Sequence, residues 1–269
     1  MPLPTPAAAE PGPVVALMYH ALHTGSTPDG QDPHYTLGTD EFELQMREVA
    51  ACGGGSSADA LLQGRSQARI LVTFDDGHAS NHALALPILS RHGITADFFI
   101  NPATVGTAGF LDWHQLRQMA DAGMSIQSHG YDHVYLTQLD DHHLRQTLAA
   151  AREEIEQQVG APVTLLAPPG GRMPKNLLAI ARECGYTHVL SSEPGVLAAA
   201  EGASRPLPRM AMTAATRHVT FQRWIRRDHV AIGHERLRYR GLALAKRMLG
   251  DTGYERVRAG ALAVLGRRA

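Results

Sequence analysis

The stretch Thr73-Phe74-Asp75-Asp76-Gly77 follows residues 68–72, a mainly apolar run that is typical of a buried β-strand. Two adjacent carboxylates at the end of such a strand repel each other, and burying either one without a partner costs free energy. A bound cation is the simplest partner that keeps both of them ionised. The stretch therefore predicts a strand that ends at a cation site, with a glycine turn after it.

A second motif, Ser128-His129-Gly130-Tyr131-Asp132-His133, supplies further metal ligands at the end of another predicted strand. His129 and His133 can converge on one metal if the turn after the strand is helical. Together with Asp76 they would leave an open coordination position, as hydrolytic metal sites do. Asp75 is then available as a general base.

Both motifs also have simpler interpretations. An Asp-Gly turn that caps a helix is common after a strand, and fifteen histidines guarantee some chance pairs four residues apart. His78 and His82 are such a pair and lie beside the two aspartates. They remain an alternative metal pair, ranked lower because His129 ends a predicted strand and they do not.

Short apolar strands alternate with amphipathic helices along the chain. This alternation predicts a parallel sheet covered by helices, and six or seven units favour a barrel over an open sheet. The intervening residues 21–38 are predicted to be a loop, and residues 53–57 a break. The predicted strands are residues 14–19, 68–75, 95–101, 124–128, 163–167, 187–190 and 207–212. One predicted helix begins at residue 39, and the others cover residues 83–92, 112–122, 140–159 and 174–184.

The polar motifs all follow the carboxyl ends of predicted strands, where parallel α/β folds bind their ligands. One of them, Pro168-Pro169-Gly170-Gly171, forces an extended and then sharply turned backbone. It is either a plain loop or a pocket wall, and in the second case the amide of Gly170 could donate to an oxyanion. His20 follows the first predicted strand and lies on the same rim.

These motifs, in this order, resemble the polysaccharide deacetylase domain, also called the NodB-homology domain or carbohydrate esterase family 4. The resemblance covers about residues 14–190, and the opening Leu17-Met18-Tyr19-His20 is similar to the branch found in exopolysaccharide systems. It implies a distorted (β/α)7 barrel, a divalent metal that is usually zinc, and hydrolysis of N-acetyl groups on amino sugars. By the same resemblance, Asp75 would be the general base, Asp76, His129 and His133 the metal ligands, Gly170 the oxyanion donor, and Tyr19, Pro168 and Pro169 substrate-binding residues.

Two departures from the family pattern leave roles open. Ala167 stands where the family often has an arginine that pairs with the base, so an orienting partner is not expected there. The usual histidine that protonates the leaving amine is not recognisable, which leaves His20 and His218 as candidates for the general acid. The stretch from residue 205 onward does not resemble the usual closure of the family's barrel.

That last stretch is strongly basic. Residues 205–269 carry 15 Lys and Arg against 4 Asp and Glu, although the whole chain has a net charge of −1. Residues 235–249 can form an amphipathic basic helix, which packs on the barrel or lies on an anionic membrane surface. A third option is binding to a polyanion, either an acidic polysaccharide or a nucleic acid. We expect three parts: a flexible leader (1–13), the α/β barrel (14–212) and a basic helical segment (213–269). No nucleic-acid partner is expected.

Composition favours an intracellular enzyme. Cys52 and Cys184 have no motif spacing and are expected to be free thiols, and the first thirteen residues lack the features of a secretion signal. We therefore expect a cytoplasmic protein, peripheral at the membrane if the basic segment binds lipid. Two alternatives to the saccharide deacetylase are an amidase of the same fold that opens small cyclic amides, and a degenerate glycan-binding module.

Overall fold

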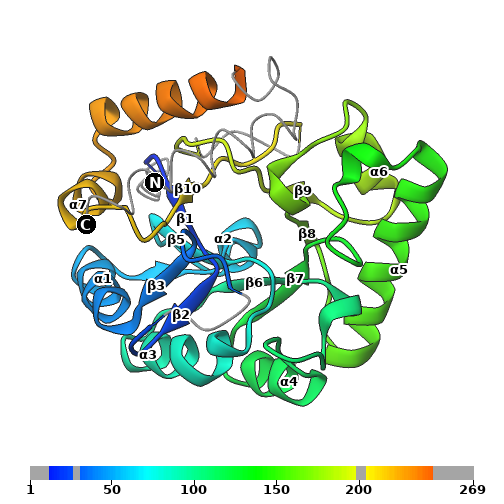
Figure 1. The fold of residues 1–269 in the computed structure, drawn as a ribbon, viewed down its shortest axis with the longest axis horizontal. Coiled ribbons are helices and arrows are strands. Elements are labelled where there is room, and N and C mark those ends of the chain that lie inside the picture. Colours follow the sequence, from blue (N-terminus) through cyan, green and yellow to red (C-terminus); the bar gives the residue numbers. More distant parts are fainter. Residues whose placement is uncertain (1–11, 27–30, 198–203, 245–269) are drawn as a thin grey trace, which may run out of the picture.

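The computed structural model describes residues 12–26, 31–197 and 204–244. Its central sheet is parallel, with the order β10-β1-β5-β6-β7-β8-β9 and with β4 paired to β5. The sheet curls round and the helices lie on its outer side (Figure 1), which confirms the predicted distorted (β/α) barrel. The strands of this sheet are β1 (Val15–Tyr19), β4 (Gly55–Ser56), β5 (Ile70–Phe74), β6 (Asp97–Ile100), β7 (Ser125–Ser128), β8 (Leu165–Leu166), β9 (His188–Val189) and β10 (Met210–Ala211).

The helices begin and end close to where the sequence places them. Asp112 and Asp140 accept hydrogen bonds from backbone amides three residues further on, so each caps the helix that follows it. Gly160, with a φ of 76°, ends the helix that covers residues 141–159. The helices are α1 (Thr39–Ala51), α2 (Ala58–Leu62), α3 (Leu86–Arg91), which follows a π-helical turn at Asn81–Ala85, α4 (Trp113–Asp121), α5 (Asp141–Val159), α6 (Leu177–Glu183) and α7 (His218–Ile225).

The residues after 205 complete the sheet. Leu17 of β1 pairs with Met210 of β10, while the other edge of β1 runs beside the whole of β5. An isolated parallel bridge between Leu190 and Leu207 joins the segment after β9 to the segment before β10. A stretch that does not resemble the family's barrel closure therefore provides the strand beside β1.

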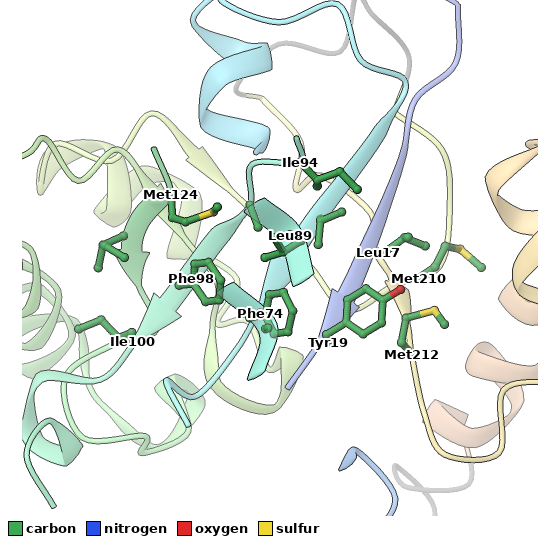
Figure 2. Packing of buried hydrophobic residues seen from close by; sticks show 14 of the residues in the cluster. Leu17, Tyr19, Phe74, Leu89, Ile94, Phe98, Ile100, Met124, Met210 and Met212 are labelled. Atoms are coloured by element: carbon green, nitrogen blue, oxygen red, sulfur yellow. The ribbon is translucent and has the colours of Figure 1, made fainter. Parts of the chain in front are cut away.

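Side chains of the strands alternate between two apolar clusters, as the period of two of a β-strand requires. Leu17, Tyr19, Phe74 and Phe98 belong to the larger cluster, between the sheet and its helices (Figure 2). Their neighbours in the strands, such as Ala16, Leu71 and Phe99, form the second cluster. This alternation decides which strand residues can reach the site described below.

The predicted loop at residues 21–38 was wrong in part, because β2 (Ala21–His23) and β3 (Thr36–Gly38) form a separate two-stranded parallel sheet. The predicted break at 53–57 likewise contains β4. Strands of two or three residues are too short to show a hydrophobic period, so the sequence pattern could not reveal them.

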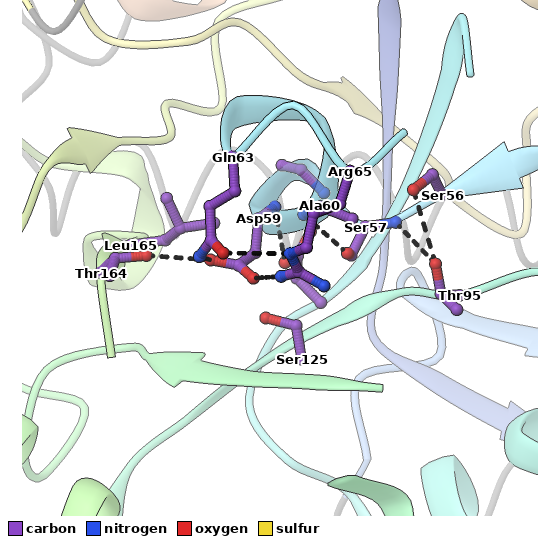
Figure 3. A network of polar contacts seen from close by, with 12 residues as sticks. Ser56, Ser57, Asp59, Ala60, Gln63, Arg65, Thr95, Ser125, Thr164 and Leu165 are labelled. Carbon is purple, nitrogen blue, oxygen red and sulfur yellow. Dashed lines mark hydrogen bonds and ion pairs between the residues drawn. The ribbon is translucent and has the colours of Figure 1, made fainter. Parts of the chain in front are cut away.

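A polar network lies around α2, at the amino end of the barrel strands (Figure 3). Ser57 caps α2, and Asp59 accepts hydrogen bonds from Gln63, Arg65 and Thr164. The buried Asp97 at the start of β6 accepts from the first amides of α2, and burial raises the pKa of this carboxyl to about 7. The network holds α2 against the sheet, beneath the starts of β5 and β6.

The C-terminal segment shares the main core. Phe221, Trp224 and Ile225 of α7 are buried in the larger cluster, together with Ala231 and Ile232. Residues 229–244 are helical, which confirms the predicted helix as far as 244, whereas 245–249 lie outside the described residues. The predicted division of the chain at 212 stays a prediction. Among the described residues, no helix is both long and apolar enough to cross a membrane.

Candidate active site

The two aspartates sit where β5 ends, with their carboxylates turned to different partners. Asp75 is 3% exposed, on the same side of the strand as Thr73 and opposite to Phe74. Asp76 has a φ of 73°, which lies in the left-handed region of the backbone. Residues other than glycine adopt this region rarely and with strain. Strain of this kind is concentrated at functional sites, where surrounding contacts maintain it. Here it places the Asp76 carboxylate beside two histidines.

Asp76, His129 and His133 converge on one point. The Oδ1 atom of Asp76 lies 3.2 Å from Nε2 of His129 and 3.1 Å from Nε2 of His133. One ligand atom from each residue lies within 4.8 Å of the others, and within the described residues this is the group that could hold a metal ion. Nδ1 of His129 donates to the carbonyl oxygen of Ala167 at 2.7 Å, so the lone pair is left on Nε2, facing the cluster. The donor set and this orientation fit a divalent metal.

The turn that joins the two histidines is not helical, so this part of the expectation was wrong. Gly130 and His133 both have positive φ values, 78° and 61°. Asn101 donates from Nδ2 to the carbonyl oxygen of His129 at 2.6 Å and holds the start of the turn. The turn brings Nε2 of His133 to 3.1 Å from the same Asp76 oxygen that His129 approaches.

The histidines of this cluster keep the Asp76 carboxylate ionised. Burial raises the pKa of Asp76, but its contacts with His129 and His133 outweigh this effect and hold the pKa well below its usual range. The hydrogen bond to Asp76 raises the pKa of His133. The carboxylate therefore stays ionised and ready to bind a cation.

The alternative pair, His78 and His82, does not form the cluster. Nε2 of His78 is 3.8 Å from Oδ2 of Asp76, beyond hydrogen-bond distance, and its ring stacks on Phe110. His82 lies in the π-helical turn before α3. His78 borders the site, whereas His129 and His133 hold its centre.

Asp75 forms a two-pronged ion pair with Arg209, a residue that sequence reasoning missed. The two guanidinium nitrogens of Arg209 donate to the two carboxylate oxygens of Asp75, at 2.7 and 2.8 Å. Both side chains are buried, at 0% and 4% exposed. The expectation that the base lacks an orienting partner was therefore wrong: the arginine comes from the residue before β10 rather than from the position of Ala167.

Arg209 is itself fixed by three further contacts. Its Nε donates to the carbonyl oxygen of Ser191 at 3.0 Å, one Nη donates to the hydroxyl of Thr73 at 3.2 Å, and its guanidinium lies 5.3 Å from the centre of the Phe99 ring. Burial raises the pKa of Asp75, but Arg209, with smaller contributions from His129 and His20, outweighs burial and lowers the pKa. Asp75 is thus ionised, with both oxygens held in a fixed plane.

The carboxylates and histidines face a cavity of about 530 Å³. This volume is within the range of sites that enclose a small ligand. Its wall combines aromatic, hydrogen-bonding and charged groups from the barrel rim, from residues 31–36 and from the helix at 229–244. The lining residues include Met18, His20, Tyr35, Asp75, Asp76, His78, His129, His133, Tyr135, Gly170, Arg172, Glu235, Arg238, Tyr239 and Leu242.

The Pro-Pro-Gly-Gly turn contributes its glycines to the cavity and not its prolines. Gly170 lines the cavity with a φ of 61°, and a Cβ there would lie 2.7 Å from the Tyr135 ring. Pro168 and Pro169 are buried and are not among the lining residues. The prolines therefore shape the turn beneath the glycines instead of contacting a ligand, which corrects their expected role. Gly170 keeps a place from which its amide can serve as the predicted donor.

Tyr19 does not line the cavity either. Its ring packs on Phe74 in the main core (Figure 2) and also on Phe42. Its hydroxyl donates to Gln45 at 2.7 Å. The alternation of β1 explains the error, because Met18 and His20 face the cavity and Tyr19 must then face the helices. The predicted substrate contact is replaced by a packing role.

Of the two candidates for the general acid, only His20 borders the cavity. Its ring stacks on Tyr35 with the centroids 4.5 Å apart, and within the described residues its buried Nδ1 has no hydrogen-bond partner. Burial lowers the pKa of His20, and the nearby carboxylates of Asp76 and Asp75 offset part of that effect. His20 can therefore exchange a proton at the site.

His218 lies elsewhere, between two carboxylates of α1. Its Nδ1 is 3.0 Å from Glu41 and its Nε2 is 2.9 Å from Glu48, so both ring nitrogens have an acceptor only when the ring is protonated. His218 thus links α7 to α1 through an ionic contact, called the His218 clip below. It does not border the cavity, so we drop it as a candidate acid.

We expect the His218 clip to make stability depend on pH. Its hydrogen bonds to Glu41 and Glu48 raise the pKa of His218 in the folded state. Its contribution is present below the unfolded pKa, about 6.5, and is lost as pH rises through the folded pKa. His218→Gln should abolish this fall in stability with rising pH. It should also lower the unfolding free energy at pH 6 by less than about 1 kcal/mol. Denaturant titrations of both proteins from pH 5 to 9 measure it, and parallel pH profiles would contradict the clip.

Residues 63–189, which carry both motifs, match the family model described as polysaccharide deacetylase. The chain contains, at these residues, a polysaccharide deacetylase domain. In fold, it is similar to the Streptococcus pyogenes deacetylase PplD, solved in complex with acetate, with a TM-score of 0.69, 23% identity, and coverage of 77% of this chain and 95% of that one.

Relatives of the deacetylase domain extend beyond the matched residues. The Bacillus subtilis protein named "Putative polysaccharide deacetylase YxkH" is 27% identical over 200 residues, 72% of this chain and 69% of the relative. The peptidoglycan-N-acetylglucosamine deacetylase of Bacillus cereus is 29% identical over 124 residues, 46% of this chain and 56% of the relative. The family implies an acetylated saccharide as substrate and a hydrolase as the class of enzyme.

Proposed function

We propose that this protein is a metal-dependent hydrolase that removes N-acetyl groups from amino sugars of a polysaccharide or of a lipid-linked glycan intermediate. The observation that carries the proposal is the pairing of two carboxylates with different partners on one cavity wall. Asp75 is held by Arg209 as an oriented base, and Asp76 is held by two histidines as a ligand. Acyl transfer to water needs both a positioned base and an electrophilic centre.

A divalent metal bound by Asp76, His129 and His133, most simply zinc, would polarise the acetamide carbonyl and lower the pKa of a water molecule. The residues of the chain supply the rest of the chemistry. Asp75 accepts the proton of the attacking water, and the amide of Gly170 donates to the carbonyl oxygen as negative charge develops there. His20 gives a proton to the sugar nitrogen as the C–N bond breaks. One water is consumed, and the products are acetate and a free amine.

The first test compares metal content with acetate release. Wild-type protein should hold close to one metal ion per chain by elemental analysis and release acetate from N-acetylglucosamine oligomers. His129→Ala/His133→Ala should lose both, because two of three ligands are removed. His142→Ala/His143→Ala, an exposed pair on α5, is the matched control and should keep both. A wild-type protein without metal after reconstitution with zinc would contradict the proposed site.

Two alternative functions, a cyclic amidase and a glycan-binding module, can be distinguished from the deacetylase by experiment. Metal binding with no acetate release from saccharides, but with opening of small cyclic amides, would favour the amidase. Oligosaccharide binding with no turnover would favour a glycan-binding module. The intact base, its arginine and the ligand cluster together support an enzyme.

A membrane contact for the basic segment and a cytoplasmic location stay predictions. In the described part of the segment, Arg236 donates to the carbonyl oxygen of Pro194, Arg238 pairs with Glu235, and Arg240 pairs with Glu193. The contacts of Arg236 and Arg240, which reach residues outside the helix, support the alternative in which the helix packs on the barrel.

A further inference from the structure

The helix at residues 229–244 presents one face to the cavity. Glu235, Arg238, Tyr239 and Leu242 all line it, and their spacing of three and four residues places them on a single side of a helix. Leu237, which faces away, is 71% exposed. The family match ends at residue 189, so this helix lies outside the matched residues 63–189. It nevertheless forms a wall of the candidate active site.

The wall is firmly attached to the rest of the molecule. Asp228 accepts hydrogen bonds from the amides of Val230 and Ala231, at 2.9 and 3.0 Å, which fixes the first turn of the helix. Ala231 and Ile232 are buried in the main core. Further along, Arg236 donates to the carbonyl oxygen of Pro194 at 3.0 Å. The cavity face is therefore held in position before any ligand arrives.

The chemistry of this face suits a neutral sugar. Tyr239 offers a half-buried aromatic ring, and the Glu235–Arg238 pair beside it offers both acceptors and donors. A sugar ring has apolar C–H faces and a rim of hydroxyl groups, so it can contact both. Two other tyrosines of the cavity already have a stacking partner: His20 covers Tyr35, and the guanidinium of Arg172 lies 4.1 Å from the centre of the Tyr135 ring.

We infer that this face is a subsite for the sugar unit next to the one that carries the reacting acetamide, with Tyr239 as its main contact. The inference rests on the proposed function and specifies its substrate as a chain of at least two amino-sugar units. Asp76 and its histidines hold the reacting unit, while the helix binds its neighbour from another wall of the same cavity. Binding energy from the second unit then helps to position the acetamide.

The test is the dependence of acetate release on chain length, measured with N-acetylglucosamine and its dimer to pentamer. For the wild type, kcat/KM should rise when the second unit is added. Tyr239→Ala should lower kcat/KM for the oligomers about tenfold, mainly through KM, and leave the monomer unchanged. Tyr239→Phe should keep most of the rise, because the ring remains.

Leu237→Ala is the matched control, since it lies on the exposed face of the same helix, and thermal unfolding checks that each variant folds. Equal profiles for Tyr239→Ala and Leu237→Ala at every length would overturn the subsite and leave the proposed function intact. Calorimetric binding of the pentamer separates the two ideas further. Binding that depends on Tyr239 without any acetate release would overturn the proposed function and keep the subsite, and absence of both would overturn both.

Discussion

Asp75→Asn should lower kcat for acetate release by a factor of about 10² to 10⁴, the range that a general base contributes. The metal content should not change, because the ligand cluster is formed by Asp76, His129 and His133. An asparagine at this position has nearly the shape of the aspartate but cannot accept the proton of the attacking water. Steady-state kinetics on an N-acetylglucosamine oligomer, with elemental analysis of the same preparation, measures both quantities.

The substitution has a second effect that needs its own control. It leaves the buried guanidinium of Arg209 without its counter-charge, so the folded state should also lose stability. Activity must therefore be compared at a temperature where denaturant titration shows both proteins to be fully folded. Turnover close to wild type in folded Asp75→Asn would remove Asp75 as the base. Loss of metal together with turnover would make Asp75 a ligand instead.

Local patterns in the sequence were enough to predict the barrel and the centre of the site. The strand that ends at Asp75 and Asp76, and the strand that ends at His129, follow from short apolar runs and from the turns after them. Parallel strands bring their carboxyl ends to one rim, so residues far apart in the sequence could be assigned to one site without knowledge of any contact. Side-chain direction needs more than a motif, as Tyr19 shows: the period of two of a strand places it opposite to Met18 and His20, in the core.

Arg209 could not be placed by the same reasoning, because it lies 134 residues from Asp75 and belongs to no recognisable motif. One signal was nevertheless present. Residues 207–212 were predicted as a strand, and an arginine in the middle of a buried strand needs a carboxylate partner. Asp75 is a carboxylate whose own motif contains no cationic partner. These two charges hint at a pair, but local patterns do not show that they meet. The wall formed by the helix at 229–244 depends on tertiary packing alone.

Arg209→Met should shift the pH dependence of the reaction and destabilise the fold. Without the guanidinium, burial is left as the main influence on Asp75, so the pKa of this carboxyl rises. The base is then protonated over more of the acidic range, and the acidic limb of the kcat/KM profile should move upward by about one to three pH units. Above that limb much of the activity should return, apart from any loss of orientation. Profiles from pH 4 to 9 measure the shift, and an unmoved limb would contradict the coupling.

The same variant should lose about 3–5 kcal/mol of unfolding free energy at neutral pH, because it leaves the Asp75 charge buried and unpaired. The sign of the pH effect distinguishes this from a loss of packing. A carboxyl whose folded pKa is depressed adds stability above its unfolded pKa, and that stability is lost as pH falls through the folded pKa. In Arg209→Met, lowering the pH protonates Asp75 and so removes its unpaired buried charge. The difference in unfolding free energy between wild type and Arg209→Met should therefore shrink from pH 7 to pH 4.

Arg209→Lys keeps the positive charge without the bidentate geometry, so its unfolding free energy should lie between those of wild type and Arg209→Met. Asp75→Asn/Arg209→Met, which leaves neither charge, should be more stable at pH 7 than Arg209→Met, and a double variant that is less stable would show that packing around Arg209 outweighs the ion pair.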